Sequence, residues 1–305
     1  MARISAIVLA VACLFSVFVS AQDAKNSGKP AKYVWYENAK MNSGKELVYS
    51  KIVAQFRDAA ATAAPDVYWL AGSPITGESG RVTFVTFHDS MASVEKMMAG
   101  FDKIDAAISM KNANLSAEAA ESDGGSHWVL AEYRENLSYR PDAVPQANTM
   151  WWATTLLNLK PGCDEEFNEV VKQVIDLHKK VNDNDHWITY SIRAGYPEPS
   201  VLFVTPMKSL AEDDQEPPAA AKELFESAPV RQMFSRIGKE CIQHIESTYT
   251  RVDPSMSRPP QSLVAANPDF WTIKPEAPVA ATKTKSGKTK KGPMEPAALK
   301  EKENK

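Results

Sequence analysis

The pentapeptide VTFVT at residues 82–86 returns in nearly the same form as VLFVT at residues 201–205, a shift of 119 positions. Upstream, a shift of 118 superimposes identical residues in three pairs: Gly44 and Gly162, Trp69 and Trp187, Gly77 and Gly195. One insertion between the strands reconciles the two shifts. Matches that keep their order and spacing are typical of a tandem duplication.

Each copy has the same sequence of hydrophobic patterns. In the first copy, β-type patterns at 33–37, 67–71, 81–87 and 127–133 alternate with helical stripes at 48–60 and 94–108, and a small-residue connection is expected over 112–126. In the second copy, strands at 150–157, 187–192, 201–205 and 247–252 alternate with helices at 167–178 and 230–241, with a polar loop over 213–221. The order β-α-β-β-α-β predicts a ferredoxin-like unit.

Such a unit covers one face of its sheet with two helices and leaves the other face bare. The strands carry too many Trp and β-branched residues to leave that face in water, since large apolar patches are rarely exposed. The sequence therefore predicts an α+β protein: tandem ferredoxin-like repeats, residues 31–140 and 147–257, packed sheet to sheet as an intrachain α/β barrel. This arrangement is a pseudo-dimer within one chain, and it leaves the oligomeric state open.

The segment from Leu159 to Phe167, LKPGCDEEF, is a strand exit and turn that lead into an acidic helix start. With the paired VTFVT and VLFVT strands, it resembles the dimeric α/β-barrel superfamily, which includes antibiotic-biosynthesis monooxygenase-like and NIPSNAP-like domains. The resemblance covers roughly 31–257. Most members of that superfamily build the barrel from two chains, whereas this chain carries both halves.

The resemblance also implies two candidate catalytic residues. Haem-degrading members of the superfamily share an Asn on the first strand and a His near the second helix, and Asn38 and His88 match these positions. A neutral imidazole can ligate iron or accept a proton. The alternative is that His88 is a surface residue at a strand end.

Aromatic residues on the predicted strands are candidates for lining a ligand pocket. We assign this role to four residues of the first copy: Trp35, Trp69, Phe84 and Trp128. The alternative is that they fill a core. His178 lies on an apolar helical stripe, and no other His has ligand spacing with it, so we expect no metal site. The sequence does not identify a cofactor.

Cys163 opens one predicted helix of the second copy and Cys241 closes the other. In a split βαβ unit these two ends lie near each other, so a disulfide is geometrically allowed. The alternative is a reduced core cysteine at position 241.

The N-terminus has the pattern of a secretory signal peptide. Arg3 precedes an apolar run that ends in Val19-Ser20-Ala21, which predicts residues 1–21 as a signal cleaved after Ala21 and a secreted or periplasmic protein. A lipoprotein anchored at Cys13 is the alternative. The apolar run is short for a membrane span, and no other segment is a candidate for a transmembrane helix.

The composition changes after residue 257. Residues 258–305 are rich in Pro and Lys and predict a disordered tail, although Phe270-Trp271 could dock on the body. Residues 274–305 hold nine Lys and four Glu, while 22–273 carry a net charge of −9. An acidic body argues against nucleic acid as a partner.

Phosphate-binding loops, nucleophile elbows and paired metal motifs are absent from the sequence. We therefore expect an exported protein whose duplicated barrel binds a small apolar molecule or a partner. Two alternatives stay open: a cofactor-independent or haem-associated monooxygenase-like enzyme, and a structural cell-envelope protein that works through its tail.

Overall fold

The computed structural model describes residues 29–273. The expected signal peptide, the Cys13 alternative and the Lys-rich part of the tail lie outside these residues. Eight strands form a closed barrel in the order β1-β3-β2-β8-β5-β7-β6-β4, and every neighbouring pair is antiparallel. The strands are β1 Tyr33–Met41, β2 Leu70–Pro74, β3 Arg81–His88, β4 Asp123–Tyr133, β5 Trp151–Leu159, β6 Ile188–Ala194, β7 Ser200–Met207 and β8 Ile242–Val252. The protein is thus α+β, with the closed barrel that the sequence predicted.

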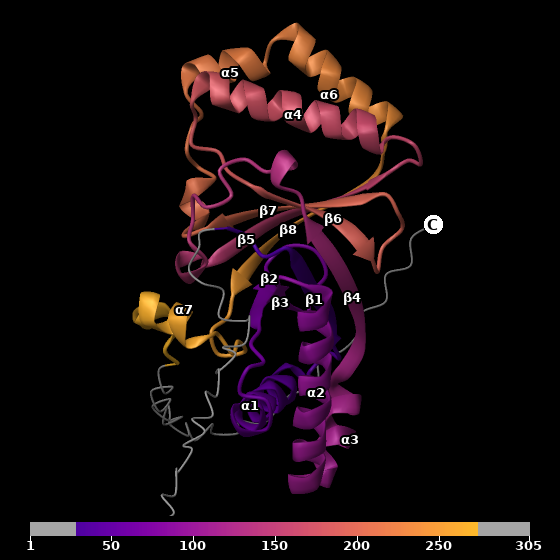
Figure 1. Cartoon of the computed structure of the whole chain (residues 1–305), viewed down its shortest axis with the longest axis vertical. Coiled ribbons are helices and arrows are strands. Elements are labelled where there is room, and N and C mark those ends of the chain that lie inside the picture. The colour runs from indigo at the N-terminus through magenta and orange to yellow at the C-terminus, as the bar shows by residue number, and fades with distance from the viewer. Residues whose placement is uncertain (1–28, 274–305) are drawn as a thin grey trace, which may run out of the picture. The chain divides into compact units, whose positions relative to one another are not determined.

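Two helical layers cover the outside of the barrel, on opposite sides in Figure 1. The first layer contains α1 (Glu46–Ala63), α2 (Met91–Lys111) and α3 (Ala113–Ser122), and the second contains α4 (Asp164–Val181), α5 (Ala219–Phe225) and α6 (Ala228–Glu240). Each layer packs on the strands of its own half: α1 and α2 enclose Trp69 and Phe84, while α4 and α6 enclose Leu157 and Leu159. Strands β1–β4 and β5–β8 are contiguous in the barrel in the orders 4-1-3-2 and 8-5-7-6.

Alternation along the strands divides the side chains between two cores. On β1, Val34 and Tyr36 point into the barrel, where they pack with Leu156 and Leu202 of the other half. Trp35 points outward into the helical layer. Because successive residues of a strand face opposite sides, each strand contributes to both cores.

The connection expected over 112–126 is instead a helix followed by the first residues of β4. Asn112 accepts a hydrogen bond from the backbone N–H of Asn114 at 3.2 Å, which caps α3. Leu115 is 2% exposed and anchors the helix. The small-residue connection is thus mostly helical, because alanine-rich segments are good helix formers when a capping residue precedes them. Helix α5 likewise begins inside the expected loop 213–221.

The body of the protein extends beyond the expected boundary at residue 258. Helices α7 (Gln261–Ala266) and α8 (Pro268–Trp271) pack against the barrel, with Leu263 and Trp271 8% and 3% exposed. The Trp271 indole N–H donates to the Ala147 carbonyl at 2.9 Å. Residues 258–273 therefore belong to the folded body. Their Pro-rich composition suggested disorder, but their apolar side chains are buried against the barrel.

Candidate functional site

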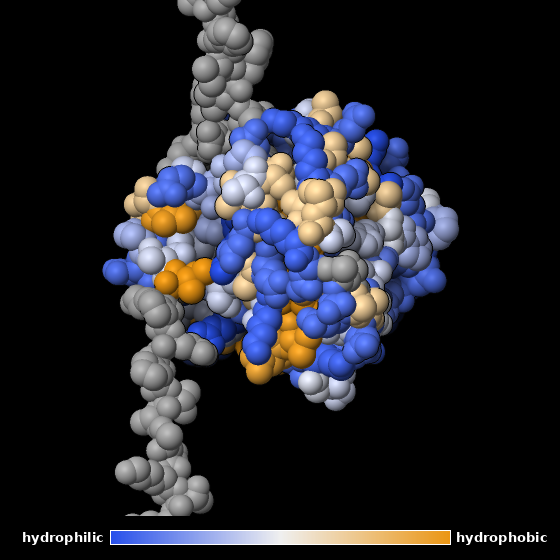
Figure 2. All heavy atoms as spheres, turned by 90° about the horizontal axis from the view of Figure 1, so that it is seen from below, coloured by the Kyte–Doolittle hydropathy of each residue, from blue (hydrophilic) through white to orange (hydrophobic). Residues whose placement is uncertain are grey.

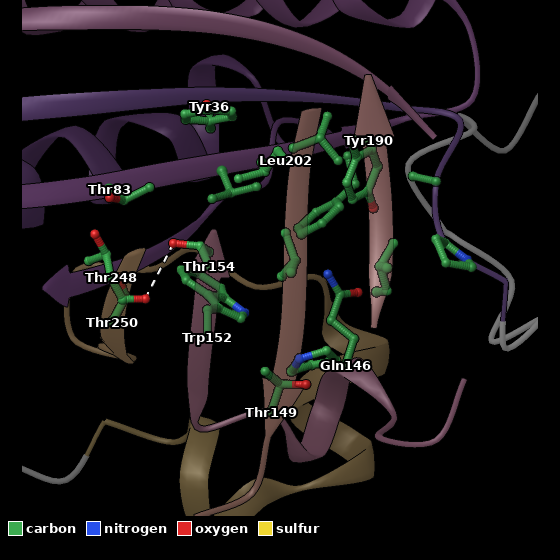
Figure 3. Close-up of a pocket in the computed structure, with 18 of the residues that line it drawn as sticks. Tyr36, Thr83, Gln146, Thr149, Trp152, Thr154, Tyr190, Leu202, Thr248 and Thr250 are labelled. Atoms are coloured by element: carbon green, nitrogen blue, oxygen red, sulfur yellow. Dashed lines mark hydrogen bonds between the residues drawn. The ribbon is translucent and has the colours of Figure 1, made fainter. Parts of the chain in front are cut away.

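A cavity of about 570 Å³ occupies the barrel interior. Its walls are mainly apolar and come from both halves, including Val34, Val85, Phe87, Trp152, Leu156, Leu202 and Val204. Small-molecule sites in proteins have volumes of about 300–1,000 Å³ and are lined mostly by apolar side chains. Figure 3 shows the opposed walls, with Tyr36 on one side of the space and Trp152 and Thr154 on the other.

Two buried phenols are among the polar side chains of the cavity wall. Tyr36 and Tyr190 are 7% and 4% exposed, and within residues 29–273 neither hydroxyl has a hydrogen-bond partner. Burial raises the pKa of both phenols above its usual range, with repulsion from Tyr196 adding at Tyr36 and from Tyr133 at Tyr190. Both therefore stay neutral at physiological pH and can donate a hydrogen bond to a bound molecule.

Asn38 belongs to this cavity. It is on β1, its partner across the β1–β3 ladder is Thr83, and the Thr83 hydroxyl donates to the Asn38 Oδ1 at 2.8 Å. Tyr196, from the turn after β6, also lines the cavity. Burial and then Glu246 raise the pKa of its phenol, while the charge of Arg81 and, to a smaller extent, a hydrogen bond with Asn38 lower it. Asn38, Thr83 and Tyr196 form a polar group at one end of the cavity, together with Arg81 and Glu246.

His88 lies on the opposite face of the same ladder and does not line the cavity. It is 1% exposed, and its Nε2 is 2.9 Å from the Thr86 hydroxyl. Its Nδ1 is buried without a hydrogen-bond partner, and burial lowers the pKa of the imidazole to about 4. The structure thus does not bring Asn38 and His88 together, nor does it leave His88 on the surface.

The arrangement around His88 does not fit a haem. An axial ligand needs a free ring nitrogen that faces a space large enough for the macrocycle. The Nε2 is engaged by Thr86, and the ring, including its unpartnered Nδ1, is buried outside the barrel cavity. Asn38, the other residue that the superfamily resemblance implied, is separated from it by the sheet.

The four aromatic residues predicted to line a pocket also lie outside the barrel. Trp69 and Phe84 pack beneath α1 and α2, and Trp35 borders the same core. Trp128 is 44% exposed and its ring centroid is 6.1 Å from that of Trp35. The structure therefore brings Trp35 and Trp128 together on the outer face, while Trp152, which was not among the predicted ligand residues, faces the cavity.

Cys163 and Cys241 form a disulfide with a Cα–Cα distance of 5.4 Å. It joins the residue before α4 to the residue after α6. These two ends meet because the helices run antiparallel on one face of the β5–β8 sheet.

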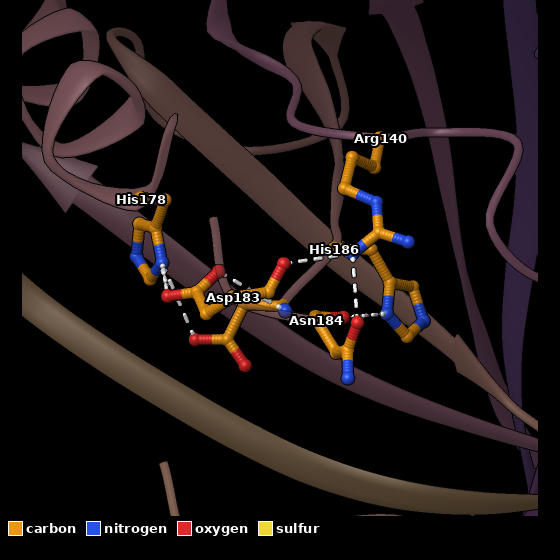
Figure 4. A network of polar contacts seen from close by, with 6 residues as sticks. Arg140, His178, Asp183, Asn184 and His186 are labelled. Carbon is orange, nitrogen blue, oxygen red and sulfur yellow. Dashed lines mark hydrogen bonds and ion pairs between the residues drawn. The ribbon is translucent and has the colours of Figure 1, made fainter. Parts of the chain in front are cut away.

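A second polar cluster surrounds the end of α4. The His178 Nδ1 lies 2.6 Å from Asp183 Oδ2 and 3.5 Å from Asp185 Oδ2, while the His178 ring packs against Tyr139, Trp187 and Phe225. Figure 4 shows Arg140 approaching the same loop, where its guanidinium donates to the Asp183 carbonyl at 2.9 Å. The cluster therefore fixes the loop after α4, and its polar atoms already have partners within the chain.

Comparisons with known proteins return fold resemblances alone. No protein-family model matches the sequence, and no curated protein matches it. Among solved structures, an anthrone oxidase-like protein is 13% identical, with 74% of this chain and 93% of that chain covered and a TM-score of 0.45. Chlorite dismutase from Candidatus Nitrospira defluvii (6% identity, 77% and 94% covered, TM-score 0.43) and a heme-binding protein from Thermus thermophilus (9%, 73% and 92%, TM-score 0.41) are also similar. Likeness at this level identifies neither a ligand nor a reaction.

Proposed function

We propose that this chain is an exported protein that binds a small, predominantly apolar molecule inside its barrel. One observation carries the proposal: the cavity of about 570 Å³ has apolar walls and two neutral phenols, Tyr36 and Tyr190, without partners among the described residues. An apolar cavity with a few convergent polar groups is the usual form of a small-molecule site. The phenols favour a molecule that offers a hydrogen-bond acceptor.

Export is supported by two independent features. The first is the signal-peptide pattern that ends at Ala21. The second is the Cys163–Cys241 disulfide, because such bonds form and persist in oxidising compartments. Mass measurement of the mature protein tests export, with a new N-terminus at Gln22 as the expected result.

We further propose that the two halves of the barrel are ferredoxin-like repeats from one duplication. Equivalent contacts recur in both halves with the sequence shift of 118 or 119. Ser257 accepts from the Ala71 N–H and donates to the Asp253 carbonyl, while Ser138 accepts from the Thr189 N–H and donates to the Arg134 carbonyl. The indoles of Trp69 and Trp187 donate to equivalent carbonyls, those of Met256 and Leu137. Repeated contacts of this kind, between residues far apart in the sequence, support a common origin better than the short sequence matches do.

The binding proposal is tested with N-phenyl-1-naphthylamine, an uncharged fluorophore whose emission rises in apolar surroundings. We expect saturable binding to the wild-type protein and its loss in Val204→Trp, which fills the cavity. The matched control is Trp128→Phe, a change on the outer face, which should bind as the wild type does. Equal binding by V204W and wild type, or loss in W128F alone, would place the ligand outside the barrel and refute the proposal.

A further inference from the structure

The two ends of the cavity differ in chemistry. One end is lined by the loop that follows β4 and by α7, with Pro145, Thr149 and Leu263 facing the space. The other end holds Asn38, Thr83, Arg81, Tyr196 and Glu246. A molecule that fills the cavity therefore meets mainly hydrocarbon along its length, Asp142, Gln146 and Thr149 at the first end, and the polar group that includes Tyr196 and Glu246 at the second.

Glu246 faces into the barrel from β8. Its partner on β5 is the buried Leu156, and it alternates with Thr248 and Thr250, which also line the cavity. The neighbouring strand β2 pairs with β8 only through Thr250–Val252, and Glu246 lies on the part of β8 beyond this ladder, where its side chain is exposed. Its position gives it access both to solvent and to the cavity.

The charge of Glu246 is not neutralised within the chain. Among residues 29–273 it forms no ion pair. The nearby cations are engaged elsewhere: Arg81 donates to Glu78 through Nε at 2.9 Å, and the Lys40 ammonium lies 2.5 Å from the same carboxylate. The field of Glu246 reaches the ligand space, since it raises the pKa of Tyr36 and Tyr196 in addition to the larger effect of burial.

We infer that the bound molecule is an apolar amine, whose ammonium group pairs with Glu246 beside Tyr36 and Tyr196 while its hydrocarbon body extends toward Trp152. A carboxylate attracts a cation more strongly where water is partly excluded. Aromatic rings stabilise the same charge through their faces. The same field repels anionic amphiphiles such as fatty acids. This inference rests on the proposed function, because it assigns the chemical class of the molecule held in the same cavity.

Inward-facing charges also occur on unpaired strand edges, where they block pairing with other molecules. That role requires no preference for a cationic ligand. The two explanations differ in what they predict for matched ligands, so the preference itself is the quantity to measure.

The experiment compares dodecylamine, dodecanol and dodecanoate by isothermal titration at concentrations below aggregation. We expect the amine to bind about tenfold more tightly than the alcohol, and dodecanoate to bind more weakly than either. Glu246→Gln should abolish the difference between amine and alcohol and leave the affinity for the alcohol unchanged. The control is Asp142→Asn, which removes an acid at the other end of the cavity and should preserve the amine preference.

Failure of the inference is distinguishable from failure of the proposed function. If dodecanol binds and dodecylamine binds no more tightly, or if E246Q keeps the preference or D142N loses it, the amine assignment is wrong and the binding function stands. If none of the three ligands nor the fluorophore binds the wild type, the proposed function fails and the inference with it. The wild-type comparison decides the matter even if E246Q does not fold.

Discussion

At the scale of single residues, His88 ties stability to pH. Its imidazole is buried and its pKa is lowered to about 4, whereas the unfolded chain takes up a proton near 6.5. The unfolded state therefore binds more protons between these values, and stability is lost as pH falls from 6.5 toward 4. At pH 5 this loss is about 2 kcal/mol. We predict that His88→Leu abolishes this loss of stability between pH 7 and pH 5. The measurement is the free energy of unfolding in urea at the two pH values, for the variant and the wild type.

Glu37 has the opposite effect on how stability depends on pH. It lies on the outer face of β1, beside Phe84 and Trp128, and burial raises the pKa of its carboxyl to about 7, with a smaller contribution from Asp123. The folded state holds this proton more tightly than the unfolded state, so stability falls as pH rises from 4.5 through 7. We predict that Glu37→Gln gains about 2 kcal/mol over wild type between pH 5 and pH 8. A constant difference between the two proteins across this range would contradict the burial of the carboxyl.

The same residues show what sequence patterns could and could not predict. Trp35 and Asn38 both lie on a strand whose faces are both buried, one by helices and one by the opposite half of the barrel. Alternation separates the two faces but does not say which one is inside, because both are apolar. The candidate ligand residues were therefore chosen from the outer face, and Trp152 was missed. The aromatic residues lie on both faces, so they do not indicate which face is inside. The alternation of side chains along each strand was enough to predict the strands themselves.

Among the secondary-structure elements, α4 and α6 of the second half are joined covalently by the disulfide. It closes a loop with a sequence separation of 78 between Cys163 and Cys241. In the chain-entropy account, a loop of this size stabilises the fold by roughly 4 kcal/mol. We predict that the Cys163→Ser, Cys241→Ser double variant loses about that much free energy of unfolding. Adding a reducing agent to wild type should give the same loss and should leave the double variant unchanged.

Helices α7 and α8 are part of the barrel's structure. The Trp271 ring is 3% exposed and packs in the cluster that contains Trp152 and Leu70. We predict that Trp271→Ala costs about 3–5 kcal/mol, the usual range for a buried aromatic residue. A chain that ends after Ile273 should keep the wild-type melting temperature, whereas one that ends after Ser257 should lose several degrees. Equal stability of the two truncated chains would mean that the α7–α8 segment does not support the fold.

The extent of the body was harder to predict than its strands. From the sequence, Phe270-Trp271 was a candidate for docking on the body, but residues 258–273 were assigned to the tail. The reason is that a Pro-rich composition is typical of disordered segments. Short helices such as α7 and α8 depend on tertiary packing rather than on their own propensity. The same holds for α3, whose anchor Leu115 is a single apolar residue in a run of small ones.

At the scale of the whole molecule, the barrel joins two halves that share an interior. The halves meet along two ladders, β2 with β8 and β4 with β6, and through the cluster of Tyr36, Leu156, Tyr190 and Leu202. The face seen in Figure 2 is mostly hydrophilic, with small separate hydrophobic areas. Inside the barrel, the inner sheet face of each half packs on the other half, while the helices cover the outer faces.

This arrangement predicts that the halves can assemble without a covalent link. A chain cut between Ala143 and Val144, with both fragments co-expressed, should yield a 1:1 complex that binds N-phenyl-1-naphthylamine as the intact protein does. Each fragment alone should aggregate, because its inner sheet face would be exposed to water. Fragments that are soluble and monomeric when expressed separately would contradict the account of a shared interior.

The central claim is that the barrel interior, rather than the space beneath the helices, receives a ligand. Crystals of the protein soaked with 2-bromonaphthalene test this directly, since the anomalous scattering of bromine locates the molecule. We predict a bromine peak inside the barrel, between Tyr36 and Trp152. A peak beneath α1 and α2 near Trp35, or a barrel that stays empty while bromine binds elsewhere, would contradict it.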